Sequence, residues 1–364
     1  MVADRLRVEA HEPPTLRRYM GLRPSYDGPG LRRLALAGTL KPAAQRRRPV
    51  PIIQVRDLHK KYRDGTHAVR GISFDVEKGE IFGLLGPNGA GKTTAMHILG
   101  TLHRATGGKA RVMGQDVVQG AKSIRHRIGF AMQDVGIDDL ATAREMLLFH
   151  ARLHGMSKAD ARRRADELLK LFDLEAHAKR RVTAFSGGMQ RRLDLAVSLI
   201  HGPDLLFLDE PTTGLDPTSR QELWNILRRL RRDHGLTVVM STHYMEEADQ
   251  LCDRIAIMAQ GKIAAIDTPE RLRRSVGADT IEVGLTDDPT AEQAKKLKQA
   301  FKDASGRLHD HKLELKVRDG GESLLPVLRV VDKVGLGVRS TKVHSPTLDD
   351  AFLKYTGQRL EVEA

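Results

Sequence analysis

The distribution of apolar residues along this chain predicts a sheet domain with crossover helices. From residue 52 onward, short apolar runs that end in polar or Gly-rich turns predict strands. These strands cover residues 52–58, 69–76, 80–85, 128–132, 205–208, 237–240 and 255–258. Helical apolar spacing and the turns before them predict helices over residues 93–99, 143–153, 158–172 and 187–200. This alternation is typical of α/β folds, and the helices between residues 132 and 205 predict a helical insertion.

The C-terminal quarter has its own alternation of strand-like and helix-like segments. They cover residues 280–285, 290–302, 313–317, 323–333, 337–343 and 348–355. This order resembles a small split βαβ module. We therefore divide the chain into a tail over residues 1–50, a sheet domain over 51–276 with a helical subdomain at about 134–190, and an α+β domain over 277–364.

Charge is unevenly spread along the chain. Of 364 residues, 60 are Lys or Arg and 47 are Asp or Glu, so the formal net charge is +13. Residues 1–50 hold eleven of the basic and four of the acidic residues, a net charge of +7, together with six prolines. We expect a mostly disordered basic tail with a short helix over residues 31–40. A solvated tail, a start codon placed too early, and a regulatory or membrane-surface arm remain open interpretations.

Composition excludes several classes of protein. With 40% hydrophobic residues the chain can form a core, and its single cysteine, Cys252, excludes a disulfide framework and a cysteine zinc site. No run of 18 apolar residues occurs, so we expect no membrane span. A basic protein suggests nucleic acid at first, but the charge outside the tail is modest, and we expect no nucleic-acid partner.

A Gly-rich loop after the apolar segment 80–85 predicts a nucleoside triphosphate site. The loop reads Gly86-Pro87-Asn88-Gly89-Ala90-Gly91-Lys92-Thr93-Thr94 and matches G-x-x-x-x-G-K-[ST] between a strand and a helix. Its glycines allow backbone N–H groups to cradle phosphate oxygens at a helix N-terminus. Lys92 is expected to contact the β- and γ-phosphates, and the Thr93 hydroxyl to bind Mg²⁺.

A second acidic site ends the apolar segment 205–208. Asp209 at the end of the strand is expected to hold Mg²⁺ through water. Glu210, one residue later, points elsewhere and is expected to act as the general base that polarises the attacking water. Together the two sites predict nucleotide hydrolysis.

One further motif gives the chain a family resemblance. Residues Ser186, Gly187, Gly188, Met189 and Gln190 open a predicted helix and follow Phe185. They resemble the signature motif of ABC ATPases, usually Leu-Ser-Gly-Gly-Gln, with Phe in place of Leu and Met in place of Gln. The motif lies 94 residues after Lys92 and 23 before Asp209, as in that family. The resemblance implies that Ser186 and Gly188 contact the γ-phosphate bound by a second copy of the chain.

Other residues match the family one by one. Gln133 resembles the Q-loop glutamine, which senses Mg²⁺ and couples to the transport subunit. Asp216 in Gly-Leu-Asp-Pro resembles the D-loop aspartate at the dimer interface. His243, 33 residues after Glu210, resembles the switch histidine that binds the γ-phosphate. Tyr62 resembles the aromatic residue that stacks on adenine.

The resemblance covers residues 52–276 and extends to one subgroup through the C-terminal region. The runs 191–196 and 242–248 and the ending Ser345-Pro-Thr-Leu-Asp-Asp-Ala-Phe-Leu353 resemble the ATP-binding subunits of daunorubicin/doxorubicin-resistance-type exporters. The implied fold is an ABC cassette of the P-loop NTPase class, with a mixed sheet, a helical subdomain and a small α+β C-terminal domain.

The implied activity is ATP hydrolysis with Mg²⁺ by a homodimer. It would power efflux of a drug, antibiotic or other lipophilic compound through a separate integral membrane permease, at the cytoplasmic face of the cell membrane. The alternatives are an importer ATPase, or one for lipid or polysaccharide export. A non-transport ABC ATPase is disfavoured because the chain has one cassette and no long insertion between Lys92 and Ser186. A non-catalytic module is disfavoured by the intact set of site residues.

Overall fold

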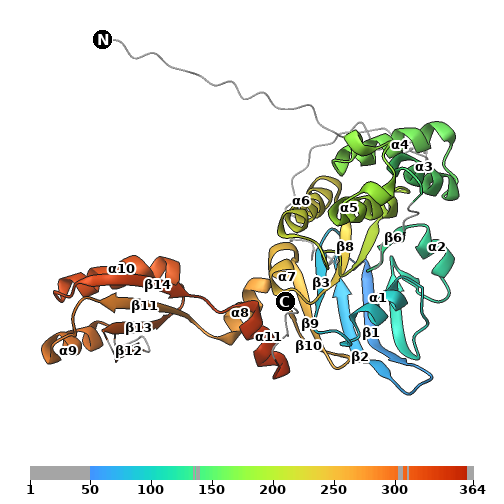
Figure 1. Ribbon diagram of the computed structural model, residues 1–364. Coiled ribbons are helices and arrows are strands. Elements are labelled where there is room, and N and C mark those ends of the chain that lie inside the picture. Colours follow the sequence, from blue (N-terminus) through green and yellow to red (C-terminus); the bar gives the residue numbers. More distant parts are fainter. Residues whose placement is uncertain (1–49, 134–135, 137–139, 302–305, 310, 359–364) are drawn as a thin grey trace, which may run out of the picture. The chain divides into compact units, whose positions relative to one another are not determined.

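A computed structural model of the chain (Figure 1) describes residues 50–133, 136, 140–301, 306–309 and 311–358. Residues 1–49 of the predicted tail, with the predicted helix over 31–40, lie outside the described residues. So do residues 134–135 and 137–139 at the start of the predicted helical subdomain, and residues 359–364.

A sheet in the order β10-β9-β3-β8-β7-β6 forms the centre of the sheet domain. Strands β9 to β6 run parallel, and β10 pairs antiparallel with β9. Its strands are β3 Ile81–Leu85, β6 Ile128–Ala131, β7 Leu205–Asp209, β8 Thr237–Thr242, β9 Arg254–Ala259 and β10 Lys262–Asp267. Every residue of β3, β7 and β8 is buried. Strands covered on both faces need apolar residues at every position, which explains the continuous apolar runs of the sequence.

A second, antiparallel sheet in the order β2-β1-β4-β5 lies against one face of the first. Its strands are β1 Ile53–Lys61, β2 His67–Val76, β4 Gly107–Val112 and β5 Gln115–Asp116. Successive side chains of the central strands point to opposite faces of the sheet and so belong to two different cores. Phe82 and Leu84 pack with the second sheet and α1, whereas Ile81 and Leu85 pack with the helices on the opposite face.

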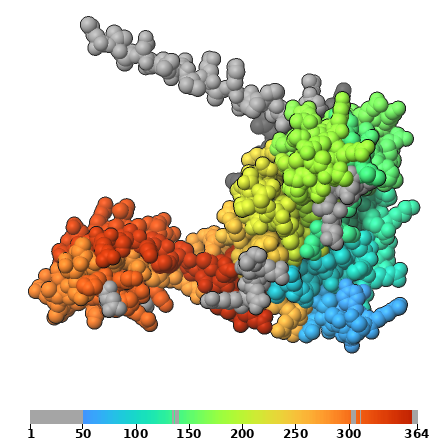
Figure 2. Space-filling view, viewed as in Figure 1, coloured from blue at the N-terminus to red at the C-terminus, as the bar shows by residue number. Residues whose placement is uncertain are grey.

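Among the described residues, the sheet domain contains the four predicted helices, α1, α3, α4 and α5, and four that were not predicted, α2, α6, α7 and α8. They are α1 Lys92–Leu99, α2 Ala121–Arg125, α3 Ala143–Leu153, α4 Lys158–Leu171, α5 Gly187–Ser198, α6 Pro217–His234, α7 Met245–Leu251 and α8 Pro269–Val276, with 3₁₀ turns Glu175–His177 and Val182–Ala184. Helices α3, α4 and α5 lie between β6 and β7 in the sequence, although these two strands are neighbours in the sheet. The three helices are the predicted insertion and form one lobe of the surface (Figure 2). A capping box between Thr142 and Glu145 explains where α3 begins.

The C-terminal region folds as a βαββαβ module. Its elements are β11 Asp279–Leu285, α9 Ala291–Ala300, β12 Gly306–His309, β13 Lys312–Val317, α10 Gly320–Lys333 and β14 Val338–His344. The antiparallel sheet has the order β12-β13-β11-β14, and one face packs on the two helices. The sequence predicted the other three strands but not β12, which is short and half polar. The module therefore has one more strand than its apolar pattern indicated.

The last helix, α11 Leu348–Thr356, belongs by its buried side chains to the sheet domain. Leu348, Ala351 and Phe352 lie in the core cluster that contains the helices of the cassette, and α11 packs against α8 and α7. We had placed this helix in the C-terminal domain over 277–364. Sequence order alone could not show that the chain leaves the sheet domain after α8 and returns to it with α11.

A half-buried histidine, His201, predicts that the stability of the fold decreases in acid. His201 Nε2 donates to the Ile128 carbonyl at 3.0 Å, and its ring stacks on His154 at 4.1 Å. Burial, together with nearby positive charge, lowers the pKa of His201 from 6.5 to about 4. The unfolded chain therefore binds a proton more readily between those values, so stability is present above pH 6.5 and is lost as the pH falls towards 4.

The unchanged chain should lose stability between pH 7 and pH 5, in part because His201 gains a proton on unfolding. We expect His201→Gln to reduce this loss by on the order of 1 kcal/mol. Urea unfolding of the two proteins at both pH values measures it. The control is His344→Gln on the exposed strand β14, which should leave the difference unchanged. An equal loss of stability on acidification in the His201→Gln protein would contradict the burial argument.

Candidate active site

Four loops of the sheet domain meet because their strands are parallel neighbours. The loops after β6, β3, β7 and β8 leave the carboxyl edge of one sheet, and Asp209 pairs in register with Ser241 as Leu85 does with Thr242. In parallel sheets ligands bind at this edge. The strand order therefore brings together the Gly-rich loop, the acidic pair, Gln133 and His243, which are far apart in the sequence.

The Gly-rich loop has the backbone that its sequence predicts. Gly89 and Gly91 have φ of 77° and 97°, values that favour glycine. A Cβ on Gly91 would lie 2.3 Å from the Ala68 carbonyl oxygen, and one on Gly86 2.2 Å from that of Met258. Larger side chains would force the loop away from β2 and β9. The loop leads into α1 at Lys92, where free backbone N–H groups favour an anion.

Lys92 is buried among acceptors. Its Nζ donates to the carbonyl oxygens of Gly86 and Pro87 at 2.8 and 3.1 Å and lies 3.2 Å from Glu210 Oε1. Its side chain is only 3% exposed. Burial lowers the pKa of Lys92, and the Glu210 carboxylate offsets part of this effect. These contacts hold the Lys92 ammonium group in the cavity, beside the Gly-rich loop.

Asp209 and Thr93 form a cluster of oxygen atoms beside Lys92. The Thr93 hydroxyl donates to Asp209 Oδ1 at 3.1 Å, and the Ser241 hydroxyl donates to the same oxygen. Asp209 is 3% exposed. Ser241 Oγ also accepts from the Glu210 backbone N–H at 3.0 Å. This bond fixes the peptide between the two acidic residues.

Glu210 faces two basic groups. Its Oε1 lies 3.2 Å from Lys92 Nζ, and its Oε2 lies 3.2 Å from His243 Nδ1. Burial raises the pKa of Glu210, but Lys92 and His243 together outweigh burial, so the net shift is downward and the carboxylate stays ionised at neutral pH. Its φ of 45° is in the left-handed region, a strained conformation that is found most often at functional sites.

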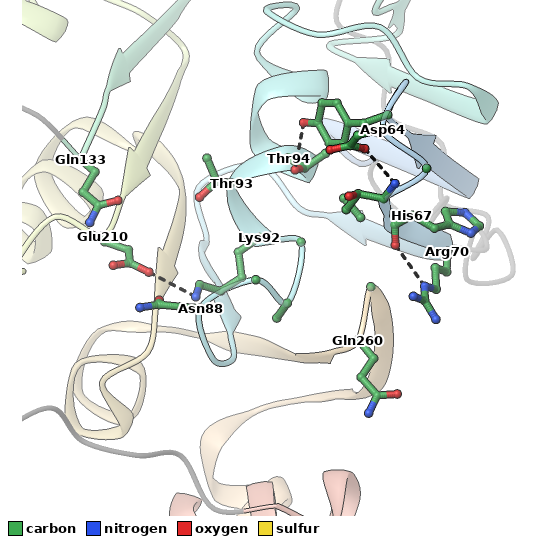
Figure 3. A pocket seen from close by; sticks show the side chains of 18 residues that line it. Asp64, His67, Arg70, Asn88, Lys92, Thr93, Thr94, Gln133, Glu210 and Gln260 are labelled. Atoms are coloured by element: carbon green, nitrogen blue, oxygen red, sulfur yellow. Dashed lines mark hydrogen bonds and ion pairs between the residues drawn. The ribbon is translucent and has the colours of Figure 1, made fainter.

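A cavity of about 960 Å³ opens in front of these residues. All the predicted loop residues from Asn88 to Thr94 line it, together with Tyr62, Gln133 and Glu210. Figure 3 shows Thr93, Lys92 and Glu210 facing the same space, with Gln133 and Gln260 at opposite sides of it. The Tyr62 hydroxyl lies 3.3 Å from Thr94 Oγ1, and the Lys60 ammonium lies over its ring.

Several lining residues were not predicted. They are Asp64, Gly65, Thr66, His67, Ala68, Arg70, Gln260 and Gly261. They come from the β1–β2 turn, from β2 and from the β9–β10 turn, none of which carries a local motif. The Arg70 N–H donates to the Gly261 carbonyl at 2.8 Å and ties these segments together. Only the pairing of distant segments reveals them.

The predicted signature residues lie apart from this cavity. Ser186 N-caps α5, and its hydroxyl accepts from the Met189 N–H at 3.3 Å. None of the residues 186–190 is among those lining the cavity of the described chain. Asp216 N-caps α6 by accepting from the N–H groups of Thr218 and Ser219, each at 3.0 Å. Both motifs thus present helix N-termini outside their own chain's cavity.

Arg191 is a buried residue whose contacts the sequence did not predict. Its guanidinium donates to the backbone carbonyls of Met132, Asp209 and Pro211. It therefore joins α5 to the ends of β6 and β7, on either side of the predicted site residues. In the sequence it reads as one of many basic residues on an amphipathic helix, so only its burial identifies it.

Comparison with known proteins agrees with this fold. The sequence pattern of the ABC transporter family matches residues 69–213, and that of the C-terminal domain of DrrA1-3-like ATP-binding proteins matches residues 268–356. The chain is 42% identical over 313 residues to the daunorubicin resistance ATP-binding protein DrrA2 of Streptomyces coeruleorubidus, covering 85% of this chain and 96% of that protein. It is 38% identical over 317 residues to the Nod factor export ATP-binding protein I of Burkholderia orbicola, covering 85% and 98%.

A solved structure has the same cassette fold. It is the ATP-binding cassette MJ0796, described as a dimer in a post-hydrolysis state bound to ADP and Pi. The match has a TM-score of 0.55 and 28% identity, and covers 59% of this chain and 98% of that one. Within the described residues, no helix is both long and apolar enough to cross a membrane. The chain belongs to the ABC transporter family, as an ATP-binding and ATP-hydrolysing subunit of the daunorubicin-resistance type.

Proposed function

We propose that the cavity binds ATP and that each predicted residue acts where it lies. Lys92 and the N–H groups of the Gly-rich loop hold the β- and γ-phosphates, and Tyr62 stacks on the adenine. Glu210 accepts the proton of the attacking water, and His243 holds the γ-phosphate. Gln133 lies near that water. The observation that carries this proposal is the chain of contacts Lys92–Glu210–His243, at 3.2 Å each, on the edge of a parallel sheet.

Thr93, Asp209 and Gln133 fit a magnesium ion. The Thr93 hydroxyl and the Asp209 carboxylate are already within 3.1 Å of each other, and Gln133 lines the same cavity. Oxygen ligands of this kind, with the remaining positions given to water and phosphate, suit Mg²⁺. When bound, the ion would neutralise charge on the phosphates. Asp209 and Ser241 then keep the Thr93 hydroxyl oriented.

The second partner in the active site is another copy of the chain. The residues 186–190 lie outside the cavity that their own chain forms, although they present a capped helix N-terminus suited to an anion. In a head-to-tail dimer, Ser186 and Gly188 of one copy would complete the phosphate site of the other. The dimeric state of the MJ0796 cassette supports this arrangement.

The transport partner is a separate membrane subunit, which would hold this chain at the cytoplasmic face of the membrane. Helix α3 exposes Phe149 and Leu153, at 59% and 67%, and Met132 just before Gln133 is 49% exposed. Large apolar side chains exposed on the helical insertion fit a protein partner. The resistance named for the daunorubicin relative favours a drug or antibiotic as the cargo, and the similarity to a Nod factor export protein supports a Nod factor as a second candidate.

Replacement of both α3 residues by aspartate tests this proposal. We expect Phe149→Asp/Leu153→Asp to lower co-sedimentation with membranes that contain the co-expressed membrane subunit by at least about tenfold, as for loss of an apolar anchor. The control is Leu325→Asp, since Leu325 is 65% exposed in the C-terminal module. Full membrane association of the double variant would contradict this docking surface, and copurification of the unchanged chain with DNA or ribosomes would contradict the transport function.

A further inference from the structure

A buried carboxyl lies behind the two loops that carry Glu210 and His243. Glu247, on α7, is fully buried, and its Oε1 accepts from Trp224 Nε1 of α6 at 3.3 Å. The hydroxyls of Thr212 and Thr242 lie near the same carboxyl. Thr212 follows Glu210 by two residues, and Thr242 precedes His243. Glu247 therefore lies between the loop after β7 and the loop after β8, and α6 supports it from behind.

A stack of side chains makes a second connection between the same segments. The centre of the Tyr244 ring lies 4.1 Å from that of the His243 ring. The Arg220 guanidinium lies over the Tyr244 ring, 4.6 Å from its centre. The Tyr244 N–H donates to Thr242 Oγ1 at 3.0 Å. Arg220 is four residues after Asp216, in the first turn of α6. The stack thus runs from His243 to the helix that Asp216 caps.

Several buried polar atoms in this part of the described chain lack a hydrogen bond of good geometry. Within the described residues, four buried side-chain atoms here lack a hydrogen bond of good geometry, namely Thr212 Oγ1, Arg220 Nε, His243 Nδ1 and Glu247 Oε2, although Thr212 lies near Glu247 and His243 Nδ1 lies 3.2 Å from Glu210. They come from the three segments that meet at this point. Most buried polar atoms in proteins are satisfied, so this group needs an explanation, and a junction that changes its hydrogen bonds when the segments move would supply one.

We propose that Arg220, Trp224, Tyr244 and Glu247 form a brace that positions His243 relative to the 210–216 loop, and so transmits movement of Asp216 to the hydrolytic site. The inference rests on the proposed roles of Glu210 and His243. The resemblance of Asp216 to the D-loop aspartate would place it at the contact with the second copy in the proposed dimer, so the brace would transmit movement at that contact. None of the four residues is among those that line the cavity of the described chain; they are positioning residues. Burial raises the pKa of Glu247, which agrees with a neutral carboxyl that acts as a hydrogen-bonding group.

Steady-state phosphate release from Mg·ATP by the full chain tests the brace. We expect Tyr244→Ala and Arg220→Ala each to lower kcat at least about tenfold while KM for ATP changes less than about threefold, because positioning errors act on the reaction more than on binding. The double variant should be no slower than the slower single variant, since both changes break one stack. Glu247→Ala should lower kcat in the same way, and Glu247→Gln should keep kcat within about threefold of that of the unchanged chain. Glu246→Ala, at an exposed neighbouring position, is the control.

The outcomes separate the brace from the proposed function. Full kcat in Tyr244→Ala and Arg220→Ala, whose side chains are partly exposed and should not prevent folding, would overturn the brace. A parallel fall in kcat, ATP affinity and melting temperature without rescue by Glu247→Gln would also overturn it, because that pattern indicates only a structural core. Fast turnover by Glu210→Gln would instead overturn the proposed function itself.

Discussion

Glu210→Gln is expected to bind ATP and to lose hydrolysis by about 10²- to 10⁴-fold, the range for loss of a general base. The glutamine keeps the size of the side chain and its contacts to Lys92 and His243, at 3.2 Å in the present structure. It cannot accept the proton of the attacking water. The low pKa that Lys92 and His243 give Glu210 against the effect of burial means that the carboxylate is present throughout the neutral range. Phosphate release measures the loss, and nucleotide titration measures binding.

The control for this variant is Glu77→Gln. Glu77 lies outside the cavity, and its contact with Glu80 is made by its backbone N–H, which the substitution keeps. It should keep full turnover. Rapid steady-state hydrolysis by Glu210→Gln would show that another group accepts the proton. Loss of ATP binding would show that Glu210 holds the nucleotide.

Lys92→Ala is expected to weaken ATP binding by at least about 100-fold, and hydrolysis falls with it. Lys92 provides the buried positive charge beside the Gly-rich loop, and a hydrogen bond to a charged phosphate oxygen contributes about 1.5–3 kcal/mol. The alanine also leaves Glu210 without its closest counter-charge, so an incoming phosphate would meet an unbalanced carboxylate. Calorimetric titration with ATP measures the affinity.

Lys109→Ala serves as the matched lysine control, because Lys109 is exposed on β4 and outside the cavity. The nucleotide-free Lys92→Ala protein should fold with lower stability, because the alanine leaves the buried Glu210 carboxylate without its closest counter-charge. Unchanged ATP affinity in the Lys92→Ala protein would contradict the phosphate contact. A failure to fold in the absence of nucleotide would assign Lys92 a structural role.

Local patterns in the sequence predicted the parts of the site, but not how they meet. The Gly-rich loop is predictable because its conformation depends on its own glycines, and α3 because its apolar residues have helical spacing. The contact of Glu210 with Lys92 depends on β3 and β7 lying on either side of β8, an order that no local pattern encodes.

The residues that the sequence did not reveal are those whose surroundings come from distant segments. Glu247 stands beside Glu246 in an acid-rich helix and looks like a solvent-exposed residue, yet it is fully buried. Arg191 reads as one basic residue among several, but binds three carbonyls. The strand β14 has no buried residue and was still predictable from its β-branched residues, whereas β12 was too short to be found.

The central claim is that two chains share two ATP molecules in sites built from both. The most direct measurement is sedimentation of Glu210→Gln with and without Mg·ATP. We predict that the 40.4 kDa chain doubles its mass when ATP is added and that the dimer retains one nucleotide per chain. A protein that binds ATP one to one and remains a monomer at saturating nucleotide would contradict the claim.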